Sequence, residues 1–363
     1  MNKRKILNVV GKVIQFNTRV QIAALKPFVK KYRQFFAENV NKGMEDDKFW
    51  SSTYFLPFDL NSIPVTDLKS NDKFAIILQG PIMMDKDFTC MTIKYYQRQY
   101  ANAKIVVSTW SDEPVENLEC IRRMNGGVEL VLNDKPENPG FLNRNFQIVS
   151  SLGGCKRAAE LGYDFIVKTR TDQCVKKRFV FSGILKLIKM FPTGDKERQK
   201  GRIFLTSNGD SIFFPYFLSD FVYAGYKEDM INLFSIPLES RSKVTLPERS
   251  TVKEFSELRY SPEIYILSLY LESMGHKCDY TVADYWKCVK KYLLCVEKSS
   301  LEIVHLKYDY KYERNYYDNE FFFEDRKELP KTYQFDFYTW LGLYNGALKY
   351  KKGYETYIER EWR

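Results

Sequence analysis

The sequence predicts a mixed α/β fold in which a mostly parallel sheet is flanked by helices. From about residue 73, short apolar segments of strand length alternate with segments of helix length. Several of the apolar segments run directly into polar clusters. At 363 residues the chain exceeds the usual size of a single core, so one large domain with attached segments is expected. Strands separated by helices favour parallel pairing with right-handed crossovers.

The elements are assigned in chain order. Strands are predicted at residues 74–78, 105–107, 128–132, 165–167 and 203–205, because each is a short apolar run. Helices are predicted at 89–100 and 145–161, and a third runs to about 274. This last helix begins after Ser261 as its N-cap, with Pro262 at the first position and Glu263 beside the positive end of the helix dipole.

The positive charge is concentrated in an N-terminal arm, residues 1–45. The net charge is +10, and residues 1–43 hold ten basic residues against one acidic residue. Apolar residues recur there at helical spacing, which is typical of a helix lying on an anionic bilayer; a helix packed on the body with a charged outer face is the alternative. Pro27 would break this helix into two parts. A nucleic-acid-binding protein would spread its cations over a folded face, so no nucleic-acid partner is expected.

The seven cysteines form no CxxC pair, so they are predicted to be reduced core residues. No apolar run approaches the roughly 18 residues of a membrane span. Lys12 and Arg19 interrupt any apolar core of a signal peptide. The expected location is therefore the cytoplasm.

Polar residues follow four of the predicted strands. Because ligands bind beyond the carboxyl ends of strands in open α/β sheets, these residues predict a nucleotide pocket. Gly80 would let the backbone approach the nucleotide, and Asp112 or Asp134 would accept hydrogen bonds from ribose or base. Taken singly, each polar residue is equally explained as a cap of the following helix. The four groups are Gln79-Gly80-Pro81, Trp110 with Asp112, Asn133-Asp134, and Arg170 with Asp172.

The cluster after the strand at 165–167 predicts phosphate and metal chemistry. Asp172 would bind Mn²⁺ or Mg²⁺ beside a diphosphate, with Arg170 and Lys168 as further cations. An ordinary Arg170–Asp172 salt bridge is the alternative. His305 would complete the coordination of the cation, or it is simply a hydrogen-bonded strand residue. Two histidines in the chain exclude a multi-histidine zinc centre.

A divalent cation and a guanidinium beside a diphosphate are the chemistry of a sugar-nucleotide transferase. If that transfer inverts configuration, it also needs a carboxylate to accept the proton of the acceptor hydroxyl. Glu263 and Asp220 are the candidates, with Glu263 preferred; an acid at a helix N-terminus is also explained by helix stability alone. The chain has neither G-x-G-x-x-G after a strand nor G-x-x-x-x-G-K-[ST], which argues against a dinucleotide dehydrogenase and a P-loop NTPase.

Taken together, the sequence motifs described above resemble those of the WavE family of bacterial lipopolysaccharide and capsule biosynthesis proteins, which are GT-A glycosyltransferases. The resemblance covers roughly residues 73–275. It implies a GT-A-like, Rossmann-like fold and transfer of a hexose from a nucleotide sugar, UDP-linked, to a growing surface glycan. Arg170 stands where the family's Asp-x-Asp pair has its first acid. The motifs that carry the likeness are residues 77–82, 103–110, 133–134 and 168–173, the helix with Asn145 and Gln147, and the segments around Asp220 and Glu263. Asn145 and Gln147 are expected to bind the nucleotide sugar.

The resulting expectation is a glycosyltransferase peripheral to the inner face of the cytoplasmic membrane, acting on a lipid-linked oligosaccharide. Its parts would be the basic arm (1–45), a GT-A-like transferase domain (46–307) and an aromatic C-terminal extension (308–363). A sugar-phosphate nucleotidyltransferase is one alternative, although residues 79–81 lack the expected Gly-rich loop with Arg and Lys. A non-catalytic glycan- or membrane-binding protein is the other.

Overall fold

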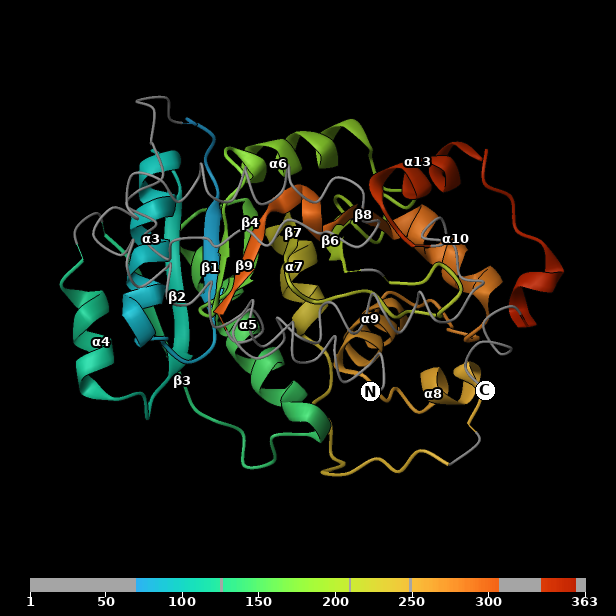
Figure 1. Ribbon diagram of the computed structural model, residues 1–363, viewed down its shortest axis with the longest axis horizontal. Helices are drawn as coiled ribbons and strands as arrows, with labels where there is room; N and C mark the ends of the chain where they lie inside the picture. The colour runs from blue at the N-terminus through green and yellow to red at the C-terminus, as the bar shows by residue number, and fades with distance from the viewer. Residues whose placement is uncertain (1–69, 125–126, 209, 248–249, 307–333, 357–363) are drawn as a thin grey trace, which may run out of the picture. The chain divides into compact units, whose positions relative to one another are not determined.

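A computed structural model describes residues 70–124, 127–208, 210–247, 250–306 and 334–356, and these residues all fall within one compact unit (Figure 1). The predicted basic arm and most of the predicted aromatic extension lie outside the described residues.

The central element is a seven-stranded sheet with the strand order β3-β2-β1-β4-β7-β6-β8. All neighbouring pairs are parallel except those made by β7, which is antiparallel to both β4 and β6. The predicted mixed, mostly parallel sheet is therefore confirmed. The strands are β1 (Ala75–Gln79), β2 (Lys104–Trp110), β3 (Glu129–Asn133), β4 (Phe165–Arg170), β6 (Ile203–Ser207), β7 (Tyr223–Tyr226) and β8 (Leu293–Glu297).

The reversed direction of β7 matters for the site. Because β7 is antiparallel to β4, its first residue lies at the edge where the other strands have their carboxyl ends. The segment before β7, which contains Asp220, therefore reaches the same edge as Arg170.

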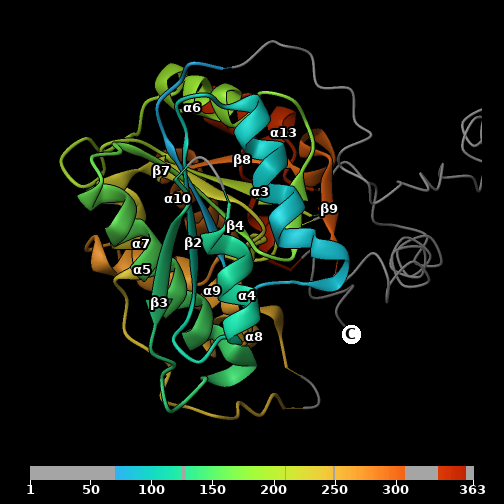
Figure 2. The ribbon, with the colours of Figure 1, turned by 90° about the vertical axis from the view of Figure 1, so that its left-hand side faces the viewer.

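Helices cover both faces of the sheet. Figure 2 shows α5 on one side of the strands and α3 on the other. Helix α5 also contacts α7, whereas Phe181 of α6 packs on Tyr96 of α3 and on Tyr100, the residue after α3. The helices are α3 (Phe88–Gln99), α4 (Val115–Arg122), α5 (Arg144–Glu160), α6 (Val180–Met190), α7 (Lys227–Phe234), α8 (Val252–Glu257), α9 (Pro262–Ser273), α10 (Val282–Tyr292) and α13 (Phe337–Asn345).

The apolar runs of β1 (residues 75–78) and β4 (residues 165–167) reflect the cover on both faces of the sheet. Every residue of β1 is buried, as expected of a central strand between two helical layers. Helix α5 crosses β1 closely at Gly154, where an added Cβ would lie only 2.6 Å from Cγ2 of Ile77. A side chain at this position would push the helix off the sheet.

The start of α9 was predicted correctly. The hydroxyl of Ser261 accepts a hydrogen bond from the backbone N–H of Ile264 at 3.2 Å, and Pro262 occupies the first helical turn. This cap fixes the position of Glu263, which is part of the candidate site.

Helix α13 covers the outer edge of β8 (Figure 1). Trp340 is fully buried, and its indole N–H donates to the carbonyl of Leu293 at 2.9 Å. The guanidinium of Arg202 donates to the same carbonyl at 3.1 Å and lies 5.6 Å from the Trp340 ring centroid. The described part of the predicted C-terminal extension thus packs directly on the sheet.

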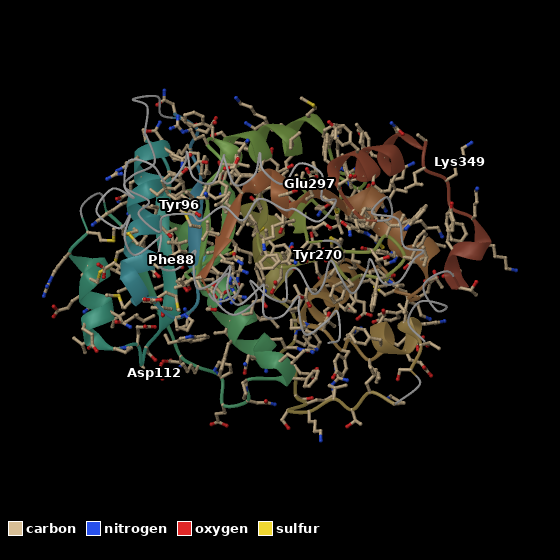
Figure 3. All side chains as sticks on the ribbon, viewed as in Figure 1. Phe88, Tyr96, Asp112, Tyr270, Glu297 and Lys349 are labelled. Carbon is tan, nitrogen blue, oxygen red and sulfur yellow. A yellow bond between two sulfur atoms is a disulfide. The ribbon has the colours of Figure 1, made fainter. Side chains whose placement is uncertain are left out.

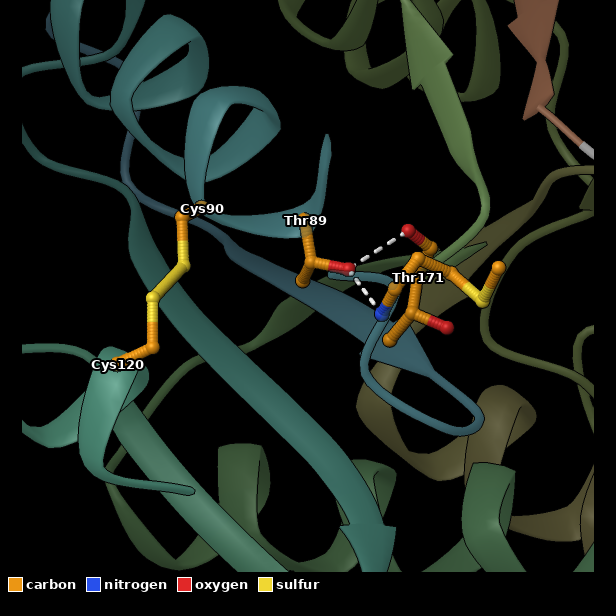
Figure 4. The surroundings of a disulfide bond; sticks show 5 residues. Thr89, Cys90, Cys120 and Thr171 are labelled. Atoms are coloured by element: carbon orange, nitrogen blue, oxygen red, sulfur yellow. Dashed lines mark hydrogen bonds between the residues drawn. A yellow bond between two sulfur atoms is a disulfide. The ribbon is translucent and has the colours of Figure 1, made fainter. Parts of the chain in front are cut away.

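The cysteine prediction was wrong for one pair. Cys90 of α3 and Cys120 of α4, 30 residues apart, form a disulfide, whereas the other five cysteines are free and buried (Figure 4). Neither residue stands in a motif that signals pairing; the two meet because the fold brings α3 and α4 together. Next to Cys90, the Thr89 hydroxyl donates to the carbonyl of Thr171 at 3.0 Å, which ties α3 to the end of β4.

Within the described ranges, none of the helices combines the length and the apolar character needed to cross a bilayer.

Candidate functional site

The end of β4 carries an ion pair that is mostly buried. Nε of Arg170 lies 2.9 Å from Oδ1 of Asp172, and Nη2 lies 2.9 Å from Oδ2, so the guanidinium donates a bidentate pair of hydrogen bonds to the carboxylate. The Asp172 side chain is 9% exposed and that of Arg170 is 25% exposed. The salt bridge considered as the alternative is therefore present, and any cation role of Asp172 has to operate beside it.

His305 is brought to this pair by a small second sheet. Strand β5 (Gln173–Val175) pairs antiparallel with β9 (Ile303–His305), and the backbone N–H of Leu306 donates to the carbonyl of Asp172 at 2.9 Å. Nε2 of His305 lies 3.9 Å from Oδ2 of Asp172. Burial lowers the pKa of His305 to about 4, although the charge of Asp172 opposes this shift. The imidazole is thus neutral near physiological pH and keeps a lone pair.

Lys168 links the end of β4 to the segment before β7. Its side chain is fully buried, and its ammonium donates to the carbonyl of Asp220 at 3.3 Å. Burial lowers the pKa of Lys168 to about 8, whereas the charge of Asp220 opposes the shift. A buried cation of this kind is suited to a ligand that brings negative charge.

Glu263 lies close enough to Asp220 for their charges to interact. Burial, followed by the negative charge of Asp220, raises the pKa of Glu263 to about 8. The dipole of α9 would favour the charged form, but loss of hydration dominates at this position. A carboxyl with this pKa can accept and release a proton near neutral pH.

Asp210 belongs to the same region and was missed as a site residue. It is buried, and burial raises its pKa to about 6. Its carboxylate accepts from the backbone N–H of Ser219 at 2.7 Å and from the Ser219 hydroxyl at 2.8 Å, so it holds the segment that carries Asp220. The Asn-Gly-Asp sequence signals only a loop, and nothing in it reveals burial.

The end of β1 lies against the loop of Asp172. The carbonyl of Gln79 accepts from the backbone N–H of Thr171 at 3.1 Å, and the Gln79 amide donates to Ser150 of α5 at 2.9 Å. Gly80 has φ +116°, and a Cβ there would lie 3.2 Å from Oγ1 of Thr171. Glycine is thus required by conformation and by the approach of Thr171. Pro81, the next residue, is exposed.

Of the predicted site residues at the ends of β2 and β3, Trp110 and Asn133 make contacts within the fold, whereas the two acids are exposed. Trp110 is buried against Phe146, with ring centroids 5.3 Å apart. Asn133 donates to the hydroxyl of Ser108 at 3.0 Å and to the carbonyl of Thr109 at 2.7 Å. Both residues serve the fold through these contacts.

The two acids at this end of the sheet remain reachable for a ligand. Asp112 pairs with Lys135 at 2.7 Å and is 62% exposed; Figure 3 shows it at the margin of the molecule. Asp134 is exposed and accepts from the Ser111 hydroxyl at 2.9 Å.

The two residues of α5 that were predicted to bind the donor differ in their hydrogen bonding. The Asn145 amide donates to the carbonyl of Glu239 at 2.8 Å and accepts from its N–H at 2.7 Å, so it is committed to the fold. Nε2 of Gln147 is buried and has no hydrogen-bond partner in the described residues. Gln147 therefore retains an unused donor.

The donor set beside β4 fits a divalent cation. Each carboxylate oxygen has two lone pairs, so each oxygen of Asp172 can accept more than its one contact with Arg170. Neutral His305 adds a nitrogen on the side of Oδ2. Oxygen and imidazole ligands suit Mn²⁺, and Mg²⁺ would rely more on water and phosphate oxygens.

An α/β sheet with clustered ionisable residues at the carboxyl ends of its strands defines a class of proteins that bind their ligand at that edge. Residues 74–358 match the WavE family, described as WavE lipopolysaccharide synthesis. The chain belongs to this family, and the match extends beyond the region of resemblance seen in the sequence to include α13.

Other comparisons add little. No curated protein matches the chain. One solved structure with detectable similarity is described as a "Putative Glucose-1-Phosphate Thymidylyltransferase" from Bacillus anthracis, in complex with a sucrose. It is 9% identical, covers 48% of this chain and 79% of its own, and gives a TM-score of 0.29. No conclusion about activity follows from so weak a likeness.

Proposed function

We propose that this WavE-family protein is a glycosyltransferase that moves a hexose from a nucleotide sugar, UDP-linked, to a lipid-linked oligosaccharide in lipopolysaccharide or capsule synthesis. The proposal rests on one observation: basic side chains and acidic side chains lie together at the same edge of the sheet. Lys168 and Arg170 provide positive charge, and Glu263 beside Asp220 provides a carboxyl with a raised pKa. A fold needs neither a buried lysine nor two neighbouring acids whose charges interact for its stability.

The diphosphate of the donor would bind beside Arg170. On binding, the guanidinium would exchange part of its contact with Asp172 for phosphate oxygens, which it can grip in the same forked geometry. That exchange would free carboxylate oxygens of Asp172 for Mn²⁺ or Mg²⁺, with His305 as the second protein ligand. When bound, such a cation would offset the charge of the departing nucleoside diphosphate.

The acceptor would bind on the side of Glu263. In an inverting transfer, the carboxylate of Glu263 takes the proton of the acceptor hydroxyl, and the hydroxyl oxygen bonds to the anomeric carbon. The bond between that carbon and the diphosphate breaks, and the diphosphate leaves with the electron pair. Asp220 keeps the proton affinity of Glu263 high through its negative charge.

The nucleoside would lie toward the ends of β2 and β3. Asp112 and Asp134 would accept hydrogen bonds from ribose or base there, and Gln147 would donate its unused N–H. Gly80 would let the backbone pass close to the nucleotide.

The test is a screen of the purified full chain against a panel of sugar nucleotides, with and without Mn²⁺. We expect one donor to release its nucleoside diphosphate faster than the others, and a chelator to slow this release. Release of pyrophosphate from a nucleoside triphosphate and a sugar phosphate would instead establish the nucleotidyltransferase alternative. Binding of glycans without turnover of any donor would leave a non-catalytic protein.

The proposed location is the inner face of the cytoplasmic membrane, and it rests on the charge of residues 1–43 alone. Deleting these residues is expected to move the protein from the membrane fraction to the supernatant, because about 1 kcal/mol of attraction per basic residue is lost. Sedimentation of the shortened chain with membranes, at the level of the full chain, would contradict this part of the proposal.

A further inference from the structure

A second group of metal-ligating side chains lies outside the candidate active site. His276 follows α9, whereas Asp284 and Cys288 are one turn apart on α10 and so share a face of that helix. The three ligand atoms all lie within 4.8 Å of one another. Nε2 of His276 is 2.9 Å from Oδ2 of Asp284 and 3.2 Å from Sγ of Cys288.

Ordinary hydrogen bonds do not account for this convergence. The Nε2 atom of His276 carries either one hydrogen or one lone pair, so it can satisfy the carboxylate or the thiol but not both. Nitrogen, oxygen and sulfur ligands around tetrahedral zinc lie roughly 3.3–3.6 Å apart, from bond lengths of about 2.0–2.3 Å. The two separations from His276, 2.9 Å to Asp284 and 3.2 Å to Cys288, need only a small outward shift to match this geometry.

The surroundings of the cluster provide the outer contacts that metal sites use. The hydroxyl of the buried Tyr216 and the backbone N–H of Asp279 both donate to Oδ2 of Asp284, which orients the carboxylate. No hydrogen bond to the other oxygen, Oδ1, occurs within the described part of the chain. The His276 side chain is 23% exposed, so solvent and ions can reach the cluster.

We propose that His276, Asp284 and Cys288 form a zinc site with three protein ligands and water in the fourth position. Zinc accepts this mixture of imidazole, carboxylate and thiolate in tetrahedral geometry. The ion would join the turn after α9 to α10. Through Tyr216 it would also brace the segment that runs on to Asp220, so it would support the acceptor side of the candidate active site without contacting substrate.

The test uses the full chain after treatment with a chelator. Titration with Zn²⁺ against a coloured competitor is expected to show one tight site per chain. Cys288→Ser and His276→Asn are each expected to weaken that site by at least about 100-fold, because a direct ligand contributes more than the outer contacts, whose loss costs about 10–100-fold. Cys155→Ala, which removes a buried cysteine of α5, is the matched control and should leave the affinity unchanged.

The absorption spectrum of the cobalt(II)-loaded protein distinguishes this site from the proposed cation site at Asp172. The wild-type chain should show thiolate-to-cobalt charge-transfer absorption, and His305→Asn should retain it, because only the site at Cys288 contains a thiolate. The absorption is read from the wild-type chain, so the test stands even if a variant fails to fold. Absence of the band, or equal zinc affinity in Cys288→Ser and wild type, would overturn the proposal, whatever the donor screen shows.

Discussion

Replacing Glu263 by Gln is expected to lower kcat for sugar transfer by about 10²–10⁴-fold, the usual contribution of a general base. The amide keeps the size of the carboxyl but cannot accept the proton of the acceptor hydroxyl. Hydrolysis of the donor by water should fall less, because water is not held by the acceptor site. Initial rates of product formation, with donor and acceptor varied separately, would measure both effects.

The pH dependence gives a second readout of the same residue. Because burial and Asp220 raise the pKa of Glu263 to about 8, the wild-type rate should rise with pH up to about that value, and the residual rate of the variant should not. A raised carboxyl pKa also means that the folded state holds the proton more tightly than the unfolded state. Stability is then lost as pH rises from about 5 to about 8, and Glu263→Gln should abolish this loss.

The matched control is Glu228→Gln, which removes an exposed acid from the first turn of α7. It should alter neither kcat nor the pH profile. A Glu263→Gln variant that transfers sugar at the wild-type rate would remove Glu263 from the mechanism and leave Asp220 as the candidate base.

Replacing Asp172 by Asn is expected to lower kcat/KM for the donor by about 10²–10³-fold, the scale found when a charge-stabilising group is removed from an active site. The substitution removes a carboxylate that holds the cation, and it leaves Arg170 without its anionic partner. The concentration of Mn²⁺ needed for half-maximal rate should rise together with KM. Donor hydrolysis at graded Mn²⁺ concentrations measures both quantities.

Asp164→Asn serves as the control for this substitution. Asp164 directly precedes β4 and pairs with Lys227 at 2.7 Å, so it lies at the opposite end of the strand that Asp172 follows. Its replacement removes an acid that flanks the same strand, at the end away from the site. If Asp172→Asn left the Mn²⁺ requirement unchanged, the Arg170–Asp172 pair would be purely structural.

Much of the fold could be predicted because central strands of parallel sheets are apolar throughout. The strands β1, β2 and β4 each contain a buried apolar run, at residues 75–78, 105–107 and 165–167, and the predicted strand positions differ from the observed ones by only a few residues. Strands β7 and β8 were not assigned. Tyr223–Tyr226 contains glycine and alanine instead of a β-branched run, and Leu293–Glu297 follows α10 without a turn signal.

The candidate site was predictable only where residues follow a recognisable strand. Arg170 and Asp172 follow β4 directly, so their proximity could be inferred from the sequence. Their contact with His305 depends on β5 and β9, which are three residues each and join segments about 130 residues apart. The burial that shifts the pKa values of Lys168 and Glu263 arises from packing of distant segments, so no local pattern could reveal it.

The pairing of Arg202 and Trp340 at Leu293 has a consequence for the solubility of the protein. Strand β8 is the last of the sheet, and a bare terminal strand offers its backbone groups to other chains. The side chains of Arg202 and Trp340 both donate hydrogen bonds to the carbonyl of Leu293, and α13 lies over the strand. A chain shortened before Asp336 would expose the backbone groups of β8 and should self-associate, so α13 protects the protein against aggregation.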